Sequence, residues 1–255
     1  MTAPKAFAHR GFAGVFPENT VAAARGAVER GADAVEVDVQ PTADGDVVVS
    51  HDRRLDGDEG LTDAEGVVWE QSTADVTGAR VLATDECVPL LADVLEVIPD
   101  HVEVNIELKN PGSDAVRPGE ALPAGARESA RERWALFVES VLSVAGEHDN
   151  DILYSSFCAG ALAAVDEADP AARVAALVAP NCADAGETVA RRYDVDAVHP
   201  PLERAGTDRS TDWATVAADI DASLNVWTIR DWQDARRAVA AGADGVIADY
   251  PGLTR

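Results

Sequence analysis

Short apolar runs rich in β-branched residues alternate with alanine-rich segments along almost the whole chain, and this alternation constrains the fold most strongly. The runs predict strands at Lys5–Ala8, Ala34–Val39, Val47–Val49, Val102–Leu108, Ile152–Ser155, Val174–Val178, Ala197–His199, Leu224–Ile229 and Gly245–Ala248. The segments between them have helical periodicity and predict helices at Thr20–Arg30, Leu90–Ile98, Arg127–Glu147, Ala159–Glu167, Ala185–Arg192, Thr211–Asp219 and Asp231–Ala241. Strands that are largely apolar on both faces and alternate with helices predict a parallel α/β sheet covered by helices.

The number of strands favours a closed barrel. Val47–Val49 follows the preceding strand closely enough to be a hairpin insertion, which leaves eight strands for the parallel sheet. Eight strands are typical of a (β/α)8 TIM barrel, and no GxGxxG or GxxxxGK[ST] motif follows any strand to support an open nucleotide-binding sheet. We therefore predict one domain over residues 1–255, with a small polar insertion over the site at about residues 53–88. Pro111–Ala126 predicts a long loop before the next helix.

The chain is strongly acidic, with 46 acidic and 21 basic residues and a formal net charge of −25. Such a surface repels polyanions, so we expect no nucleic-acid partner and no stable association with an anionic membrane. Lys5 and Lys109 are the only lysines. An acidic, lysine-poor composition is typical of halophilic proteins, because molar salt shortens the Debye length to about 3 Å and screens the self-repulsion. A merely acidic mesophilic protein is the alternative interpretation.

The cysteines and the apolar runs predict a cytoplasmic protein. Cys87, Cys158 and Cys182 are odd in number and form no CxxC motif, which argues against a disulfide framework or a zinc site and fits a reducing compartment. The sequence contains no secretory apolar region and no apolar run of about 18 residues.

Three carboxylates occupy strand ends, where the loops of a (β/α)8 barrel build its active site. Glu36 and Asp38 lie two residues apart on one strand, so both side chains point to the same face. Glu107 ends the next strand of the parallel sheet and supplies a third carboxylate. Carboxylates that converge this way repel one another unless a hard cation lies between them, so we predict one divalent cation, Mg²⁺ or Ca²⁺. The alternative, solvated charges on an exposed strand, conflicts with the valines around them.

Two histidines and two cations follow strands at the same end of the predicted barrel. Histidine side chains in general have a pKa near neutrality, so the pair His9 and His51 could divide general-acid and general-base work. The planar guanidinium of Arg10 can donate two hydrogen bonds to the oxygens of one phosphate. The ammonium group of Lys109 carries a localised positive charge and lies on the same strand face as Glu107. These residues predict phosphate chemistry.

Several blocks of sequence resemble the glycerophosphodiester phosphodiesterase family. They are AHRGFAGVFPENT at Ala8–Thr20, GADAVEVDVQPTADGDVVVSHD at Gly31–Asp52, VPLLADVLEVIP at Val88–Pro99, VNIELK at Val104–Lys109, SSF at Ser155–Phe157, VWTI at Val226–Ile229 and GADGVIADYPG at Gly242–Gly252. The resemblance runs over nearly the whole chain. It implies a barrel in which the three carboxylates hold a divalent metal, the two histidines form the acid–base pair, and Arg10 and Lys109 bind the phosphate.

Other positions have more than one interpretation. Trp227 is either a wall for the glycerol or head group or a core residue. His199 ends a strand without a charged neighbour, so structural and substrate-lining roles both remain open. Glu18 has two interpretations. It orients His9 or Arg10, or it is an acidic residue of the kind favoured near the start of a helix. Asn19 is predicted to be the N-cap of the helix that begins at Thr20.

The predicted activity is metal-dependent hydrolysis of small glycerophosphodiesters to sn-glycerol 3-phosphate and an alcohol, with the two histidines as acid and base. In the family, the glycerol 2-hydroxyl is thought to attack phosphorus and form a cyclic phosphate that water opens. One alternative is a lysophospholipase D-like or cyclising lipid phosphodiesterase on the same barrel. Such an enzyme needs an exposed apolar surface beside its site, and only 5% of the residues are aromatic, too few to form one. Another is a catalytically silent barrel that binds phosphate esters, although no predicted histidine or metal carboxylate is missing.

Overall fold

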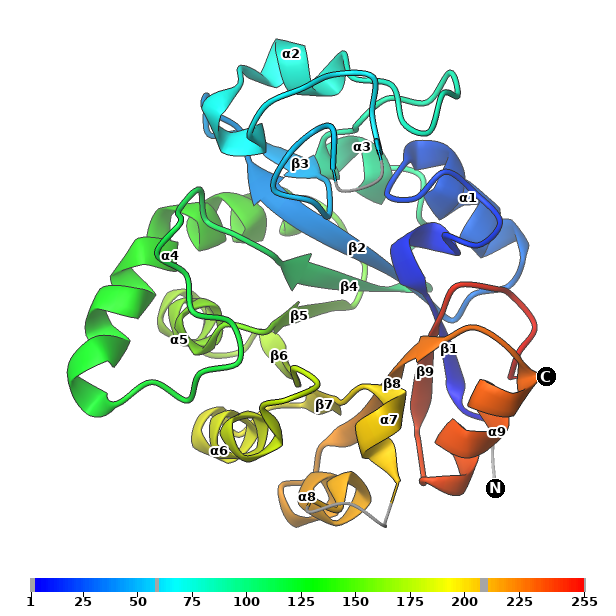
Figure 1. Cartoon of the computed structure of the whole chain (residues 1–255), viewed down its shortest axis with the longest axis vertical. Coiled ribbons are helices and arrows are strands. Elements are labelled where there is room, and N and C mark those ends of the chain that lie inside the picture. Colours follow the sequence, from blue (N-terminus) through cyan, green and yellow to red (C-terminus); the bar gives the residue numbers. More distant parts are fainter. Residues whose placement is uncertain (1–2, 58–59, 207–210, 255) are drawn as a thin grey trace.

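Eight parallel strands form a closed barrel in the computed structural model, which describes residues 3–57, 60–206 and 211–254 (Figure 1). The strands are β1 (Lys5–Ala8), β2 (Ala34–Pro41), β4 (Glu103–Leu108), β5 (Ile152–Ser156), β6 (Arg173–Leu177), β7 (Ala197–His199), β8 (Ser223–Ile229) and β9 (Gly245–Ala248). Strand β1 pairs in parallel with both β2 and β9, and this double pairing closes the sheet. The predicted (β/α)8 barrel is confirmed.

Helices surround the barrel (Figure 1). They are α1 (Val21–Glu29), α2 (Thr73–Thr77), α3 (Leu91–Leu95), α4 (Ala124–Ala145), α5 (Ala159–Ala168), α6 (Ala183–Tyr193), α7 (Leu202–Ala205), α8 (Trp213–Asp219) and α9 (Trp232–Ala240), with 3-10 turns η1 (His9–Gly11) and η2 (Val68–Glu70). Their ends differ from the predicted ones by a few residues, because periodicity alone does not locate caps. Within the described residues, no helix is both long and apolar enough to cross a membrane.

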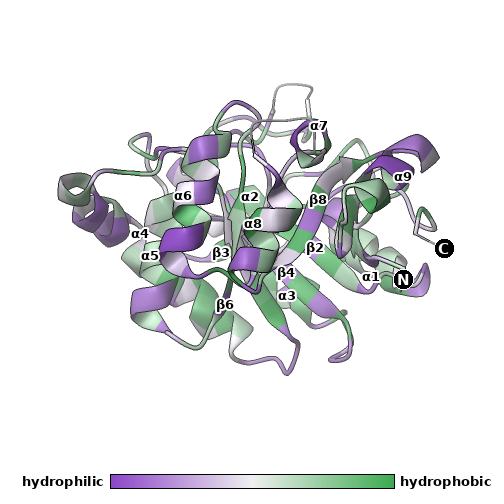
Figure 2. Cartoon of the chain, turned by 90° about the horizontal axis from the view of Figure 1, so that it is seen from below, coloured by the Kyte–Doolittle hydropathy of each residue, from purple (hydrophilic) through white to green (hydrophobic). Residues whose placement is uncertain are grey.

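Strand β2 shows how the sequence divides the barrel into an apolar outside and a polar inside. Its three valines belong to the main hydrophobic core, which also contains the buried faces of the surrounding helices. The alternate positions carry Glu36, Asp38 and Gln40, which are equally buried. Side chains on a strand alternate between faces, so these polar groups line the barrel interior. At the level of the whole domain, Figure 2 shows hydrophobic strand segments at the centre and hydrophilic residues along outer helices such as α6 and α9.

The hairpin predicted after β2 is present, and it carries the chain towards His51. Strand β3 (Val47–Val49) pairs antiparallel with β2, after a turn in which Gly45 has a φ of +91°. The segment that follows includes η2 and α2 and packs on β3 through a small hydrophobic cluster of its own. The cluster consists of Val48, Leu55, Val68, Val76, Ala79, Val81 and Val88.

The predicted N-cap of α1 is wrong by one residue. The hydroxyl of Thr20, and not the side chain of Asn19, accepts the hydrogen bond from Ala23 N–H. Asn19 has a φ of +56°, a left-handed conformation that asparagine tolerates better than most residues. Its amide donates to Asp38 Oδ2 at 2.9 Å and its carbonyl oxygen accepts from Asp38 N–H at 3.3 Å. Asn19 therefore ties the first βα loop to β2.

Candidate active site

A cavity of about 280 Å³ lies at the ends of the barrel strands. It is lined by His9, Arg10, Glu36, His51, Asn105, Glu107, Lys109, Phe157, Leu177, Trp227, Thr228, Arg230 and Ile247. The barrel thus brings together most of the residues singled out in the sequence, from positions spread over more than two hundred residues. Asp38 and Glu18 lie behind the lining and contact Arg10.

The three predicted metal carboxylates converge. Glu36, Asp38 and Glu107 are buried, and one oxygen from each lies within 4.8 Å of the others. Glu36 Oε2 accepts a 2.8 Å hydrogen bond from Arg10 N–H. In the described part of the chain, Glu36 Oε1 forms no hydrogen bond, and Asp38 Oδ1 has only an ion pair with Lys109 Nζ at 3.3 Å. Buried carboxylate oxygens without a donor are costly, so the cluster has the oxygen chemistry and the unsatisfied atoms that suit a hard divalent cation.

Two basic side chains offset part of this negative charge. Arg10 Nε lies 3.2 Å from Asp38 Oδ2, and its Nη1 donates to Glu18 Oε1 at 2.7 Å. Lys109 Nζ lies 2.7 Å from Glu107 Oε1 and 3.3 Å from Asp38 Oδ1. Burial lowers the pKa of each base, but attraction to these carboxylates outweighs it and raises the pKa overall. Both side chains are therefore held charged at the cavity.

The pKa values of the three carboxylates are shifted in different directions. Burial raises the pKa of Glu36 well above its usual range, and repulsion from Asp38 and Glu107 adds to the effect. Burial also raises the pKa of Glu107 to about 7, although Lys109 opposes it. Burial acts on Asp38 too, but Lys109, His51 and Arg10 outweigh it and lower its pKa. Two nearby cations therefore do not fully compensate three buried carboxylates, and additional positive charge would favour their ionised form.

Each histidine of the cavity has one ring nitrogen held by a carboxylate. His9 Nδ1 lies 2.6 Å from Asp249 Oδ1, and His51 Nδ1 lies 2.7 Å from Asp52 Oδ1. Because an ionised carboxylate only accepts hydrogen bonds, Nδ1 carries the proton in both rings. Nε2 is then the nitrogen that is left for a substrate. Arg230 Nε contacts the other oxygen of Asp249 at 3.2 Å.

A buried glutamine fixes the loop that carries His51. Gln40 Nε2 donates to the carbonyl oxygens of Ser50 at 2.9 Å, His51 at 3.3 Å and Asp52 at 2.8 Å. Burial lowers the pKa of His51, with further lowering by Lys109 and Arg10 and a partial opposing effect of Asp38. The neutral imidazole is therefore favoured near neutral pH.

Aromatic side chains form an apolar wall of the cavity. The rings of Phe157 and Trp227 meet edge to face with centroids 5.7 Å apart, and Lys109 Nζ lies 5.8 Å from the Phe157 centroid. Trp227 Nε1 donates to the carbonyl oxygen of His199 at 2.7 Å. His199 itself is fully buried beside Asn225 and does not line the cavity. Of its two interpretations, the structural one fits the geometry.

The comparison with known protein families agrees with the resemblance seen in the sequence. The model of the glycerophosphoryl diester phosphodiesterase family matches residues 9–253. The chain belongs to this family. As a member of the glycerophosphoryl diester phosphodiesterase family, it is a phosphoric diester hydrolase that acts on glycerophosphodiesters.

Individual relatives are similar to this chain over almost their whole length. YqiK of Bacillus subtilis (strain 168) is 30% identical, with 97% of this chain and 95% of that protein covered. A glycerophosphodiester phosphodiesterase of Bacillus altitudinis is 28% identical, again with 97% and 95% covered. Among solved structures, an Oleispira antarctica phosphodiesterase in complex with the product sn-glycerol-3-phosphate has a TM-score of 0.76 and 25% identity, covering 98% of this chain and 94% of that one.

Sequence reasoning missed several residues of this site, among them Asp249 and Gln40, which contact the two histidine-bearing segments. Asp249 directly follows β9, so the strand-end rule that selected the histidines could have selected it as well. Gln40 lies four residues after Glu36, on the same strand face as the two carboxylates of β2. Neither residue type stands out alone, because a loop aspartate and a strand glutamine are usually solvated.

Proposed function

We propose that this chain hydrolyses small glycerophosphodiesters to sn-glycerol 3-phosphate and an alcohol, with one divalent cation, Mg²⁺ or Ca²⁺, held by Glu36, Asp38 and Glu107. The observation that carries the proposal is the convergence of these carboxylates and two carboxylate-bound histidines on one 280 Å³ cavity. The product complex of the Oleispira antarctica phosphodiesterase supports the choice of sn-glycerol 3-phosphate as the product. When bound, the cation would supply positive charge that polarises the phosphoryl group.

The two histidines divide the proton transfers in this proposal. His51, whose pKa is lowered by burial, accepts the proton of the attacking hydroxyl at Nε2. His9 donates a proton from Nε2 to the departing alcohol oxygen, while Asp249 stabilises the charged ring through Nδ1. If the glycerol 2-hydroxyl attacks, a cyclic phosphate forms, and the same two residues act in reverse roles as water opens it. Asp52 and Gln40 are positioning residues for His51.

Two basic and two aromatic side chains of the lining bind and orient the substrate. Arg10 and Lys109 are held charged by buried carboxylates, and their attraction to the diester phosphate complements the metal. Trp227 and Phe157 offer an apolar wall to the carbon skeleton of the glycerol. Glu18 orients Arg10, and Asn19 orients Asp38.

Leaving-group chemistry tests the two histidine roles separately. A glycerophosphodiester of 4-nitrophenol needs little protonation of its leaving oxygen, whereas glycerophosphoglycerol needs full protonation. We expect His9→Ala to lose on the order of 10²–10⁴ in kcat on glycerophosphoglycerol and much less on the nitrophenyl ester, and His51→Ala to lose a similar factor on both. His148→Ala, outside the cavity lining, is the matched control. Near-normal turnover of both histidine variants on glycerophosphoglycerol contradicts the assignment.

Broader properties belong to the same proposal. We propose that residues 1–255 form one domain, with the segment at about 53–88 as an insertion over the site. From the charge of −25 and the cysteine content, we also propose a halophilic, cytoplasmic enzyme without nucleic-acid or stable membrane partners.

A further inference from the structure

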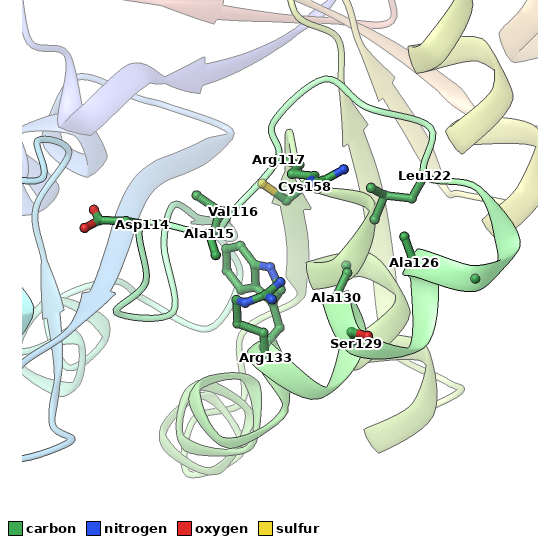
Figure 3. A pocket seen from close by; sticks show the side chains of 13 residues that line it. Asp114, Ala115, Val116, Arg117, Leu122, Ala126, Ser129, Ala130, Arg133 and Cys158 are labelled. Carbon is green, nitrogen blue, oxygen red and sulfur yellow. The ribbon is translucent and has the colours of Figure 1, made fainter.

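A second cavity of about 440 Å³ lies beside the first three turns of α4 (Figure 3). Its walls come from the long loop after β4, from α4 and from the start of α5. It shares no lining residue with the catalytic cavity. Its volume falls within the range of small-molecule sites, roughly 300–1,000 Å³.

The lining of this second cavity combines an apolar floor with a cationic rim. Trp134, Leu122 and Cys158 form the floor and are almost completely buried. The side chains of Arg117 and Arg133 contribute the rim. Arg133 directly precedes Trp134 on α4, and both residues line the cavity. A ligand in this cavity could therefore contact an apolar surface and a guanidinium at once.

Protein groups balance the positive charges at the rim only in part. The acid of the lining, Asp114, points away from the cavity in Figure 3 and pairs with Arg53 Nη2 at 2.7 Å. Arg117 has a long, exposed contact of 3.5 Å with Glu120. Arg133 forms no ion pair with any residue in 3–57, 60–206 or 211–254. In a chain of net charge −25, this cavity therefore has an excess of positive charge.

We propose that the second cavity binds an amphiphilic anion, with a carboxylate or phosphate-monoester head on Arg133 and Arg117 and a short alkyl body over Trp134. A guanidinium supplies the donors that such head groups accept, and the floor removes the alkyl body from water. The site is separate from the phosphodiesterase chemistry, so the inference does not depend on the proposed reaction.

The loop that walls the second cavity also holds a residue of the catalytic cavity. Gly119 N–H, within this loop, donates to the carbonyl oxygen of Phe157 at 2.8 Å. Phe157 lines the catalytic cavity and Cys158 lines the second one. An anion that orders this loop is therefore expected to change the KM for the diester through Phe157.

Calorimetric titration of the full chain at one fixed KCl concentration tests the site. The probes are hexanoate, hexyl phosphate and hexan-1-ol, which share an alkyl body and differ in head group. We expect one molecule of at least one anion to bind with a Kd of about 1 mM or tighter, and the alcohol to bind at least about tenfold more weakly. Arg133→Gln should weaken anion binding by roughly 5- to 30-fold. Arg127→Gln, on the same helix but outside the lining, should not.

Further measurements make the outcome decisive. Ser129→Trp should fill the cavity and abolish binding. Because sn-glycerol 3-phosphate has the head group but no alkyl body, it should compete at least about tenfold more weakly than hexyl phosphate. Unchanged melting temperatures of both variants would show that they fold. The proposal is overturned if neither anion binds at 10 mM, or if hexan-1-ol binds as tightly as the anions. It is equally overturned if Ser129→Trp binds like the wild type, or if sn-glycerol 3-phosphate displaces the anion as effectively as hexyl phosphate does.

Discussion

The contact between His9 and Asp249 provides the sharpest prediction about catalysis. Its 2.6 Å length joins two side chains that are 18% and 15% exposed, so water screens it little. A hydrogen bond to a charged group of this kind contributes about 1.5–3 kcal/mol. Burial raises the pKa of Asp249, but the hydrogen bond and charge of His9 and the nearby Arg230 outweigh it, so the pKa is lowered overall and the carboxylate stays ionised.

Replacing Asp249 with asparagine keeps the size of the side chain and removes its charge. If the full contribution acts on the charged ring in the transition state, Asp249→Asn should reduce kcat by about 10- to 150-fold, since 1.36 kcal/mol corresponds to a factor of ten. The assay is steady-state hydrolysis of glycerophosphoglycerol with saturating metal. The loss should shrink on a 4-nitrophenyl diester, because its leaving group needs little protonation.

The matched control is Arg230→Gln. Arg230 contacts the other oxygen of Asp249 at 3.2 Å, but its side chain is 68% exposed, so its removal should change kcat by less than about threefold. If Asp249→Asn turns over glycerophosphoglycerol within twofold of the wild type, Asp249 does not support His9. If Asp249→Asn loses the same factor in kcat on both substrates, Asp249 does not act through protonation of the leaving group.

Three other predictions concern metal, pH and salt. EDTA should abolish hydrolysis, and Mg²⁺ or Ca²⁺ should restore it. Calorimetry should show that Glu36→Gln binds the metal much more weakly than the wild type. Full activity in metal-free buffer contradicts the metal site. Burial lowers the pKa of His199 to about 3, whereas a histidine in the unfolded chain has a pKa of about 6.5. Between these two pH values the unfolded state binds a proton that the folded state does not, so the folded state loses stability as the pH falls. In denaturant titrations, the free energy of unfolding should fall by about 2 kcal/mol between pH 8 and pH 5 because of His199, and His199→Gln should lack this contribution. If the free energy of unfolding of the wild type and of the variant changes with pH in the same way, the prediction is refuted. The melting temperature should rise from about 0.1 M to molar KCl, and a flat or falling trend would remove the halophilic interpretation.

The sequence alone determined the barrel and most of the residues around the catalytic cavity. The alternation of strands and helices is a local pattern, and eight parallel strands that bury both faces close most readily into a barrel. Once that fold is predicted, the ends of the strands converge, so Glu36, Glu107, His9 and His51 could be placed together without coordinates. Their residue types and spacing then indicated the chemistry.

Tertiary structure decided which partner each group has. His9 and Asp249 are 240 residues apart and meet only because β1 pairs with β9 to close the barrel. Asn19 was expected to cap a helix, and the fold instead directs it to Asp38. Such contacts depend on register and on the backbone conformation of loops, which residue periodicity does not encode.

Burial and cavities were also decided by the fold. The raised pKa of Glu107 depends on how completely the barrel excludes water from it, and the position of His199 beneath the cavity depends on strand register. The second cavity arises where the loop after β4 packs against α4 and α5, three segments with no common motif. A sequence specifies which side chains share a strand face, whereas distances across loops and the volumes between elements follow only from packing.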